Sequence, residues 1–166
     1  FGEHYTSWVS YTLSRVVQEF PGLNNDLEFF ADHDQRHEFK VVNMVSLPKW
    51  DFSLTWVIAS GKPFTAPVGI DSVAGTQEIR FGKLNGDRLP IYHRLDLSAG
   101  FKHTFNRGLQ LKTGITFFNL YNRGNIKDQQ YSLAWNEDGV EDISGITRLD
   151  RYYLGFSPNL YLRLNF

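Results

Sequence analysis

A repeated alternation of apolar and polar residues with a period of two constrains this chain more than any other feature. Successive side chains of a β-strand point to opposite faces, so such segments predict strands with one apolar and one polar face. Residues 38–47 alternate less regularly, because Asn43 falls among apolar side chains. The sequence predicts an all-β, antiparallel chain of about six strands, within the segments 6–14, 38–47, 51–59, 93–105, 109–117 and 159–166.

The connections between these segments alternate strictly in length. Residues 47–50 and 105–108 form tight links, whereas 18–36, 60–92 and 122–150 are long and rich in Gly, Asn and Asp. Bacterial outer-membrane barrels have short periplasmic turns and long extracellular loops. The pattern therefore indicates a segment of a transmembrane β-barrel.

Aromatic residues and strand length agree with this interpretation. The strands approach the ~9–11 residues that cross a bilayer when tilted, and no apolar stretch reaches the roughly 18 residues of a membrane helix. Aromatic side chains gather near strand ends on the apolar face, as interfacial girdles do. They are Tyr5, Trp50, Phe105, Tyr121, Tyr152 and Phe166.

The opposite face carries residues that suit a wet interior. Eight strands enclose just enough space for side chains, so a closed barrel of six strands has no room for large charged ones. We expect six strands of a larger barrel, with the whole chain, 1–166, as one part of it. The start at Phe1 and the lack of a signal peptide predict that upstream sequence is missing. The polar residues expected to face the lumen are Arg94, Asp96, Lys102, Lys112 and Arg163.

Composition and motifs exclude several functions. The net charge of −1 gives no basic surface for nucleic acid, and the absence of cysteine excludes disulfides and thiolate metal sites. No nucleophile–base pair or phosphate loop occurs, so we expect no enzyme, no catalytic residue and no cofactor. The one cluster with metal-ligand chemistry matches no compact zinc motif, so no metal site is predicted. It comprises Asp32, His33, Asp34, His37 and Glu38.

Three further groups have both a structural and a functional interpretation. His93, Arg94 and Asp96 could support acid–base chemistry, but Arg94 and Asp96 share one face and predict a solvated ion pair. Asn85-Gly86 and Asp87-Arg88 predict a turn in the second long connection, of the type I′ geometry that Asn-Gly favours, with a ligand-contacting loop tip as the alternative. The last group predicts a hairpin tip, with stacking against a sugar as the alternative; it comprises Trp135, Asn136, Glu137 and Asp138.

The chain ends in NLYLRLNF, an amphipathic strand with a final aromatic residue. This ending resembles the C-terminal signal by which the barrel assembly machinery recognises outer-membrane proteins. An exposed strand of this kind can add to another sheet edge by β-augmentation. The residues predicted to form the signal are Leu160, Leu162, Leu164 and Phe166.

Four internal segments are similar to motifs of TonB-dependent outer-membrane receptors, in the order of that family. They are DQRH at 34–37, SGKPFT at 60–65, RLP with YHRLDL at 88–97, and FNLYNR at 118–123. The resemblance implies a place in the cell outer membrane, in contact with its lipid, and a 22-stranded barrel. It also implies an N-terminal plug and import of a scarce nutrient with energy relayed by TonB.

Nothing in this chain resembles the plug or a TonB box. A contact with the TonB complex would therefore run through a plug outside this chain. The ligand-binding residues and the transported ligand are not predicted; siderophores, vitamins and glycans are the classes that the resemblance implies. A passive porin and a soluble all-β binding module are the two alternatives.

Overall fold

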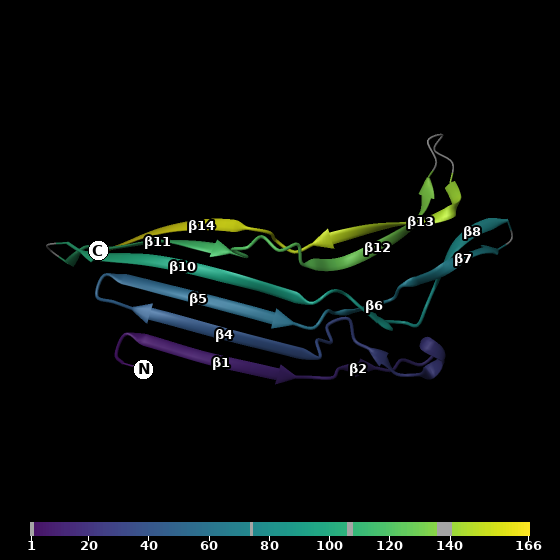
Figure 1. Ribbon diagram of the computed structural model, residues 1–166, viewed down its shortest axis with the longest axis horizontal. Helices are drawn as coiled ribbons and strands as arrows, with labels where there is room; N and C mark the ends of the chain where they lie inside the picture. The colour runs from purple at the N-terminus through teal and green to yellow at the C-terminus, as the bar shows by residue number, and fades with distance from the viewer. Residues whose placement is uncertain (1, 74, 106–107, 136–140) are drawn as a thin grey trace.

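The computed structural model describes residues 2–73, 75–105, 108–135 and 141–166. A six-stranded antiparallel sheet forms its main body, in the order β1-β4-β5-β10-β11-β14 (Figure 1). The strands of nine to thirteen residues confirm the predicted all-β antiparallel fold, including the irregular segment 38–47. They are β1 (Tyr5–Leu13), β4 (His37–Ser46), β5 (Trp50–Ala59), β10 (Tyr92–Thr104), β11 (Gln110–Phe118) and β14 (Ser157–Asn165).

The sheet is open. In the described residues β1 pairs only with β4, and β14 only with β11. The tight links β4–β5 and β10–β11 lie at the same end as both chain termini, called the turn end below (Figure 1). The three long connections leave from the opposite end, called the loop end. They are the first loop (14–36), the second loop (60–91) and the third loop (119–156).

The loops contain short sheets that the sequence analysis did not predict. The third loop forms a long hairpin, β12 (Ile126–Trp135) with β13 (Glu141–Tyr152). Among the described residues, no helix is both long and apolar enough to cross a membrane. The other loop elements are β2 (Val17–Gln18), η1 (Asn24–Asp26, a 3₁₀ turn), β3 (Phe29–Phe30), β6 (Pro63–Phe64), β7 (Pro67–Val73), β8 (Thr76–Phe81) and β9 (Asp87–Arg88).

The strand register keeps the two faces separate across all six strands. One complete row of cross-strand partners is apolar or aromatic throughout: Tyr5, Val45, Phe52, Ala99, Ile115 and Leu160. The adjacent row points to the opposite side: Thr6, Met44, Ser53, Ser98, Thr116 and Asn159. The side containing the first row is the apolar face, and the side containing the second is the polar face.

Buried apolar side chains are few and do not cover the apolar face. In the described residues they are Phe29, Ala31, Val57, Ala59 and Leu89, which lie towards the loop end. On the apolar face Val9 is 61% exposed, Leu160 81% and Leu162 69%. Asn43, a polar residue on this face, accepts hydrogen bonds from the Tyr5 and Ser7 hydroxyls. The sheet therefore has no hydrophobic core of its own.

Tyr161 fixes the last strand against its neighbours on the polar face. It is the cross-strand partner of Gly114, which in turn is the partner of Gly100. A Cβ atom at Gly114 would lie 2.6 Å from the Tyr161 ring, and one at Gly100 would lie 2.8 Å from its hydroxyl oxygen. The two glycines therefore make room for the tyrosine ring, as aromatic side chains cover glycines in other sheets.

Candidate functional site

A buried ion pair joins the first and second loops at the loop end. Asp34 has no exposed surface; its carboxylate accepts hydrogen bonds from the Arg88 guanidinium and from the Val16 amide at 2.6 Å. Burial by itself raises the pKa of Asp34, but those hydrogen bonds and the charges of Arg88 and Arg36 outweigh it and lower this pKa below its usual value. The carboxylate therefore stays ionised.

Arg88 also connects the loops through its other contacts. Its Nη1 donates to the carbonyl oxygens of Asp34 at 3.2 Å and of Gly61 at 3.1 Å, and the guanidinium lies 4.9 Å from the Phe30 ring centroid. A Cβ atom at Gly61 would lie 1.6 Å from the Leu89 carbonyl oxygen, so only glycine fits there. Three of the four receptor-like segments thus meet at this point.

Asn85 is buried rather than at a loop tip. Its amide donates to the Phe30 carbonyl and the Asp32 carboxylate, both at 2.7 Å. The predicted turn is present, but it spans 83–86 and is closed by Gly86 N–H to the Lys83 carbonyl at 2.9 Å. A type I′ turn at Asn85-Gly86 is wrong, because Asn85 has a φ of 51° whereas Gly86 is not among the positive-φ residues.

Two buried asparagines hold the start of the third loop. The Asn119 amide donates to the carbonyls of Arg123 at 2.9 Å and Leu154 at 3.2 Å. The Asn125 amide exchanges two hydrogen bonds with the His93 backbone, at 2.9 and 3.1 Å, as a neighbouring strand would. Sequence reasoning missed both roles; the clustered asparagines at 119, 122 and 125 were the available signal, since Asn tolerates the positive φ seen at 119 and 122.

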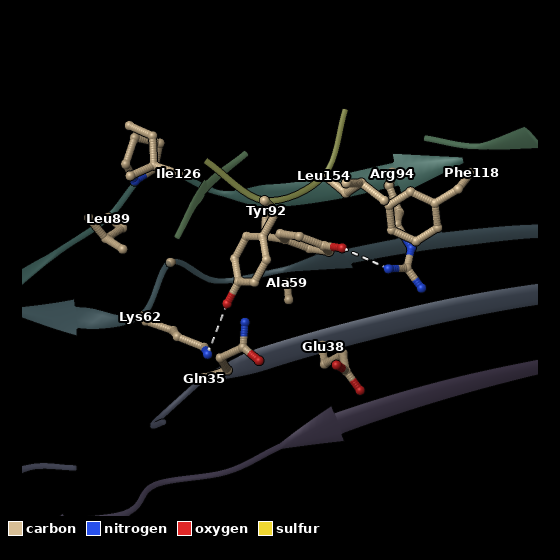
Figure 2. A pocket seen from close by; sticks show the side chains of 13 residues that line it. Gln35, Glu38, Ala59, Lys62, Leu89, Tyr92, Arg94, Phe118, Ile126 and Leu154 are labelled. Carbon is tan, nitrogen blue, oxygen red and sulfur yellow. Dashed lines mark hydrogen bonds between the residues drawn. The ribbon is translucent and has the colours of Figure 1, made fainter. Parts of the chain in front are cut away.

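The polar face and the loops enclose a pocket of about 260 Å³ at this end of the sheet. Figure 2 shows Lys62 and Arg94 on opposite sides of it, with Gln35 and Glu38 along one wall. Tyr92 and Tyr153 pack edge to face with their ring centroids 5.6 Å apart. The pocket thus combines aromatic walls with several polar groups, which is the usual composition of a ligand site.

The charged side chains of the pocket differ in their partners. Arg94 donates from Nη1 to the Tyr92 hydroxyl at 3.1 Å, stacks 4.3 Å from the Phe118 ring centroid, and places Nε 3.0 Å from Asp96 Oδ2. Glu38 pairs with Lys40 at 2.7 Å. Lys62 donates to the Tyr153 hydroxyl at 3.1 Å. In the part of the chain that the structure describes, no carboxylate pairs with Lys62.

A second hollow of about 370 Å³ adjoins the pocket and shares Lys62, Leu89 and Tyr153 with it. Its other walls come from all three loops and include Asp32, Thr65 and Lys127. The two spaces therefore form one groove that runs from the polar face to the loops.

All five residues predicted to face the lumen lie on the polar face. Arg94 and Asp96 form the predicted ion pair, but it is partly buried rather than solvated, with the two side chains 29% and 17% exposed; Lys102 pairs with Asp51 at 3.2 Å. Towards the turn end, Lys102, Lys112 and Arg163 are direct cross-strand partners in one row. Like charges placed opposite one another are unfavourable unless solvent or an acidic partner offsets them.

The predicted terminal signal lies on the edge strand β14. Leu160, Leu162 and Leu164 point to the apolar face and are 81%, 69% and 47% exposed, and Phe166 follows the strand fully exposed. Nothing in the described chain covers this edge.

The remaining candidates do not form a chemical centre. Asp34 is held by Arg88, and within the described ranges no group of three His, Cys, Asp or Glu residues could hold a metal ion. The predicted hairpin tip is Trp135–Asp138. Residues 136–138 lie outside the described residues, and the Trp135 backbone ends β12.

Comparisons of the chain with protein families, with curated proteins and with solved structures find no match.

Proposed function

We propose that this chain is part of the wall of a β-barrel in a bacterial outer membrane, and that the barrel is a TonB-dependent receptor for a scarce nutrient. The observation that carries the proposal is the largely apolar face of the six strands, on which no described side chain is buried, opposite a polar face. Its strands of nine or more residues are about 30 Å long or longer, enough to cross a bilayer when tilted.

Energetics favour hydrocarbon as the environment of that face. Each large apolar side chain gains roughly 1.5–3 kcal/mol when it leaves water. Exposed apolar patches on soluble monomers rarely exceed a few hundred Å². Leu160 and Leu162 are among several exposed apolar residues on β1, β5 and β14, and the apolar side chains of β4, β10 and β11 on this face are half-buried rather than buried. Covering the whole face is therefore worth several times the effect of one residue. Lipid covers such a face uniformly.

The open edges determine what else the proposal needs. Unpaired backbone groups in lipid cost several kcal/mol each, so β1 and β14 require neighbouring strands. In our proposal the rest of the same barrel supplies them, and the polar face lines its interior. The row formed by Lys102, Lys112 and Arg163 then meets water, counter-ions or an acidic surface of the plug.

Two features support the receptor class over a passive porin. Three of the four segments that resemble receptor motifs are joined by the Asp34–Arg88 pair and the Gly61–Leu89 contact, so these three act together as one structure at the loop end. The groove beside them lies where a ligand would enter from outside. The barrel assembly machinery would bind the β14 edge, and contact with the TonB complex would be made by the plug.

Cell fractionation and uptake test the proposal. The full-length protein should stay with the outer membrane after alkaline carbonate washing and leave it only with detergent. Cells that lack TonB should no longer take up the nutrient that this protein transports. Release by carbonate would support a soluble binding module and overturn the membrane assignment. Uptake that continues without TonB would overturn the receptor class and leave a passive porin.

A further inference from the structure

We propose that the pocket between Lys62 and Arg94 binds one sugar ring that carries a carboxylate, a uronic acid residue. As an account of what is imported, this inference rests on the proposed function; as an account of binding, it stands on the pocket alone.

The size of the pocket limits what it can hold. Its volume of about 260 Å³ lies just below the ~300–1,000 Å³ of pockets that hold drug-sized ligands. A single six-membered ring fits, whereas a large metal chelate does not. Tyr92 and Tyr153 present aromatic surfaces on which the carbon–hydrogen face of such a ring can pack.

The charge of the pocket selects the carboxylate. Arg94 already forms an ion pair with Asp96, and Glu38 already forms one with Lys40. Among the described residues, Lys62 donates one hydrogen bond, to the neutral Tyr153 hydroxyl, and its ammonium lies 5.9 Å from the Tyr153 ring centroid, which leaves two of its ammonium donors for a ligand. A carboxylate placed there gains a charge-assisted hydrogen bond, which is roughly twice as strong as a neutral one.

The remaining polar groups select hydroxyls. The Glu38 carboxylate and the Gln35 side-chain carbonyl line one wall and are acceptors (Figure 2). A hydroxylated ring can donate to both, whereas an aromatic acid without hydroxyls would bury the Gln35 carbonyl without a partner, which is costly. The chemistry therefore favours an acidic sugar over benzoate-like acids and over neutral sugars.

The adjoining hollow extends the inference to more than one ring. It opens across Lys62 and Tyr153, and its wall carries Lys127 together with two carboxylates. Of these, Asp128 is paired with Arg151 at 2.6 Å, and Asp32 accepts a hydrogen bond from the Asn85 amide at 2.7 Å. A second uronic acid residue linked to the first would occupy it. We therefore expect digalacturonate to bind more tightly than galacturonate.

Isothermal titration calorimetry on the full-length protein purified in detergent tests this. Galacturonate should bind at least about tenfold more tightly than galactose, a difference of 1.4 kcal/mol, and benzoate should give no heat. Lys62→Met should lower galacturonate affinity at least about tenfold and galactose affinity by less, because galactose has no carboxylate to lose its partner. Lys112→Met, which removes a lysine from the same face at the turn end, should change neither.

Equal affinity for galactose and galacturonate, an equal effect of the two lysine substitutions, or no binding of any sugar would overturn the inference. Circular dichroism must show unchanged β-structure in Lys62→Met; if that variant misfolds, Lys62→Gln is measured instead, with the same expectation. Failure of binding in a protein that still resists carbonate extraction refutes the ligand alone. A carbonate-released protein that binds galacturonate refutes the membrane assignment alone.

Discussion

Replacing the two glycines beneath Tyr161 should have different consequences. Alanine at 114 would place its Cβ 2.7 Å from the Ala99 carbonyl oxygen as well as against the Tyr161 ring. The Ala99 carbonyl belongs to the backbone of β10 and cannot rotate away as a side chain can, so the added methyl group overpacks the site, at a cost of about 1–3 kcal/mol. This cost exceeds the ~0.5–1 kcal/mol by which alanine is more favourable than glycine in a strand. Gly114→Ala should therefore destabilise the protein by about 1–2 kcal/mol.

Gly100 provides the matched control. An alanine Cβ there meets the Tyr161 hydroxyl oxygen at 2.8 Å, and the nearest backbone atom is 3.8 Å away. Because Tyr161→Phe removes that oxygen, Gly100→Ala should be neutral or stabilising by up to about 1 kcal/mol in the Tyr161→Phe background. Gly114→Ala should remain destabilising in both backgrounds.

The assay is urea unfolding of the protein folded in lipid vesicles, followed by tryptophan fluorescence, for a double-mutant cycle at each glycine. If Tyr161→Phe rescues both glycine substitutions equally, or if Gly114→Ala is neutral, then Tyr161 does not lie over β11 as described. The register of the last strand would then be wrong.

Four other perturbations test the loop end and the terminal strand. Gly61→Ala should separate the second loop from the Leu89 backbone, seen as faster amide hydrogen exchange there; unchanged exchange would refute the contact. Arg88→Met should lower the free energy of unfolding by about 3–5 kcal/mol, because it leaves the buried Asp34 carboxylate without its cationic partner. A decrease below about 1 kcal/mol would contradict the buried pair. Folding lowers the pKa of Asp34, so its ionised carboxylate stabilises the fold above the ordinary pKa of about 4. This stabilisation is lost as the pH falls through the lowered pKa of the folded protein. Amide hydrogen exchange in the first and second loops should therefore rise below about pH 4 in the wild type and not in Asp34→Asn. Deleting Phe166 should reduce surface assembly; normal surface levels would count against a terminal signal.

The strands of the main sheet were predictable because each has one apolar and one polar face. Even the irregular β4 follows this rule, since Asn43 is satisfied by the Tyr5 and Ser7 hydroxyls. The β12–β13 hairpin was not predicted, because its faces mix apolar and polar residues; Gln129 and Tyr131 share a face, for example, and hydrogen-bond to each other. Alternation detects a strand only where its two sides meet different surroundings.

The candidate site was less predictable because it depends on contacts between distant segments. Asp34 and Arg88 lie 54 residues apart in the chain, and Lys62 and Tyr153 lie 91 apart. Arg94 and Asp96, two residues apart on one strand, were paired correctly from the sequence. Asn85 was interpreted as a turn residue, since its burial follows only from the packing of two loops.

Cysteine labelling tests the central claim most directly, because the chain contains no cysteine of its own. Leu97 and Ser98 are neighbours on β10 that point to opposite faces. In protein assembled in bilayers of brominated lipid, a bimane label at Leu97→Cys should be quenched by the lipid chains. The same label at Ser98→Cys should be quenched by aqueous iodide. A Leu97 label that neither quencher reaches, in a protein that stays in solution without detergent, would contradict the account.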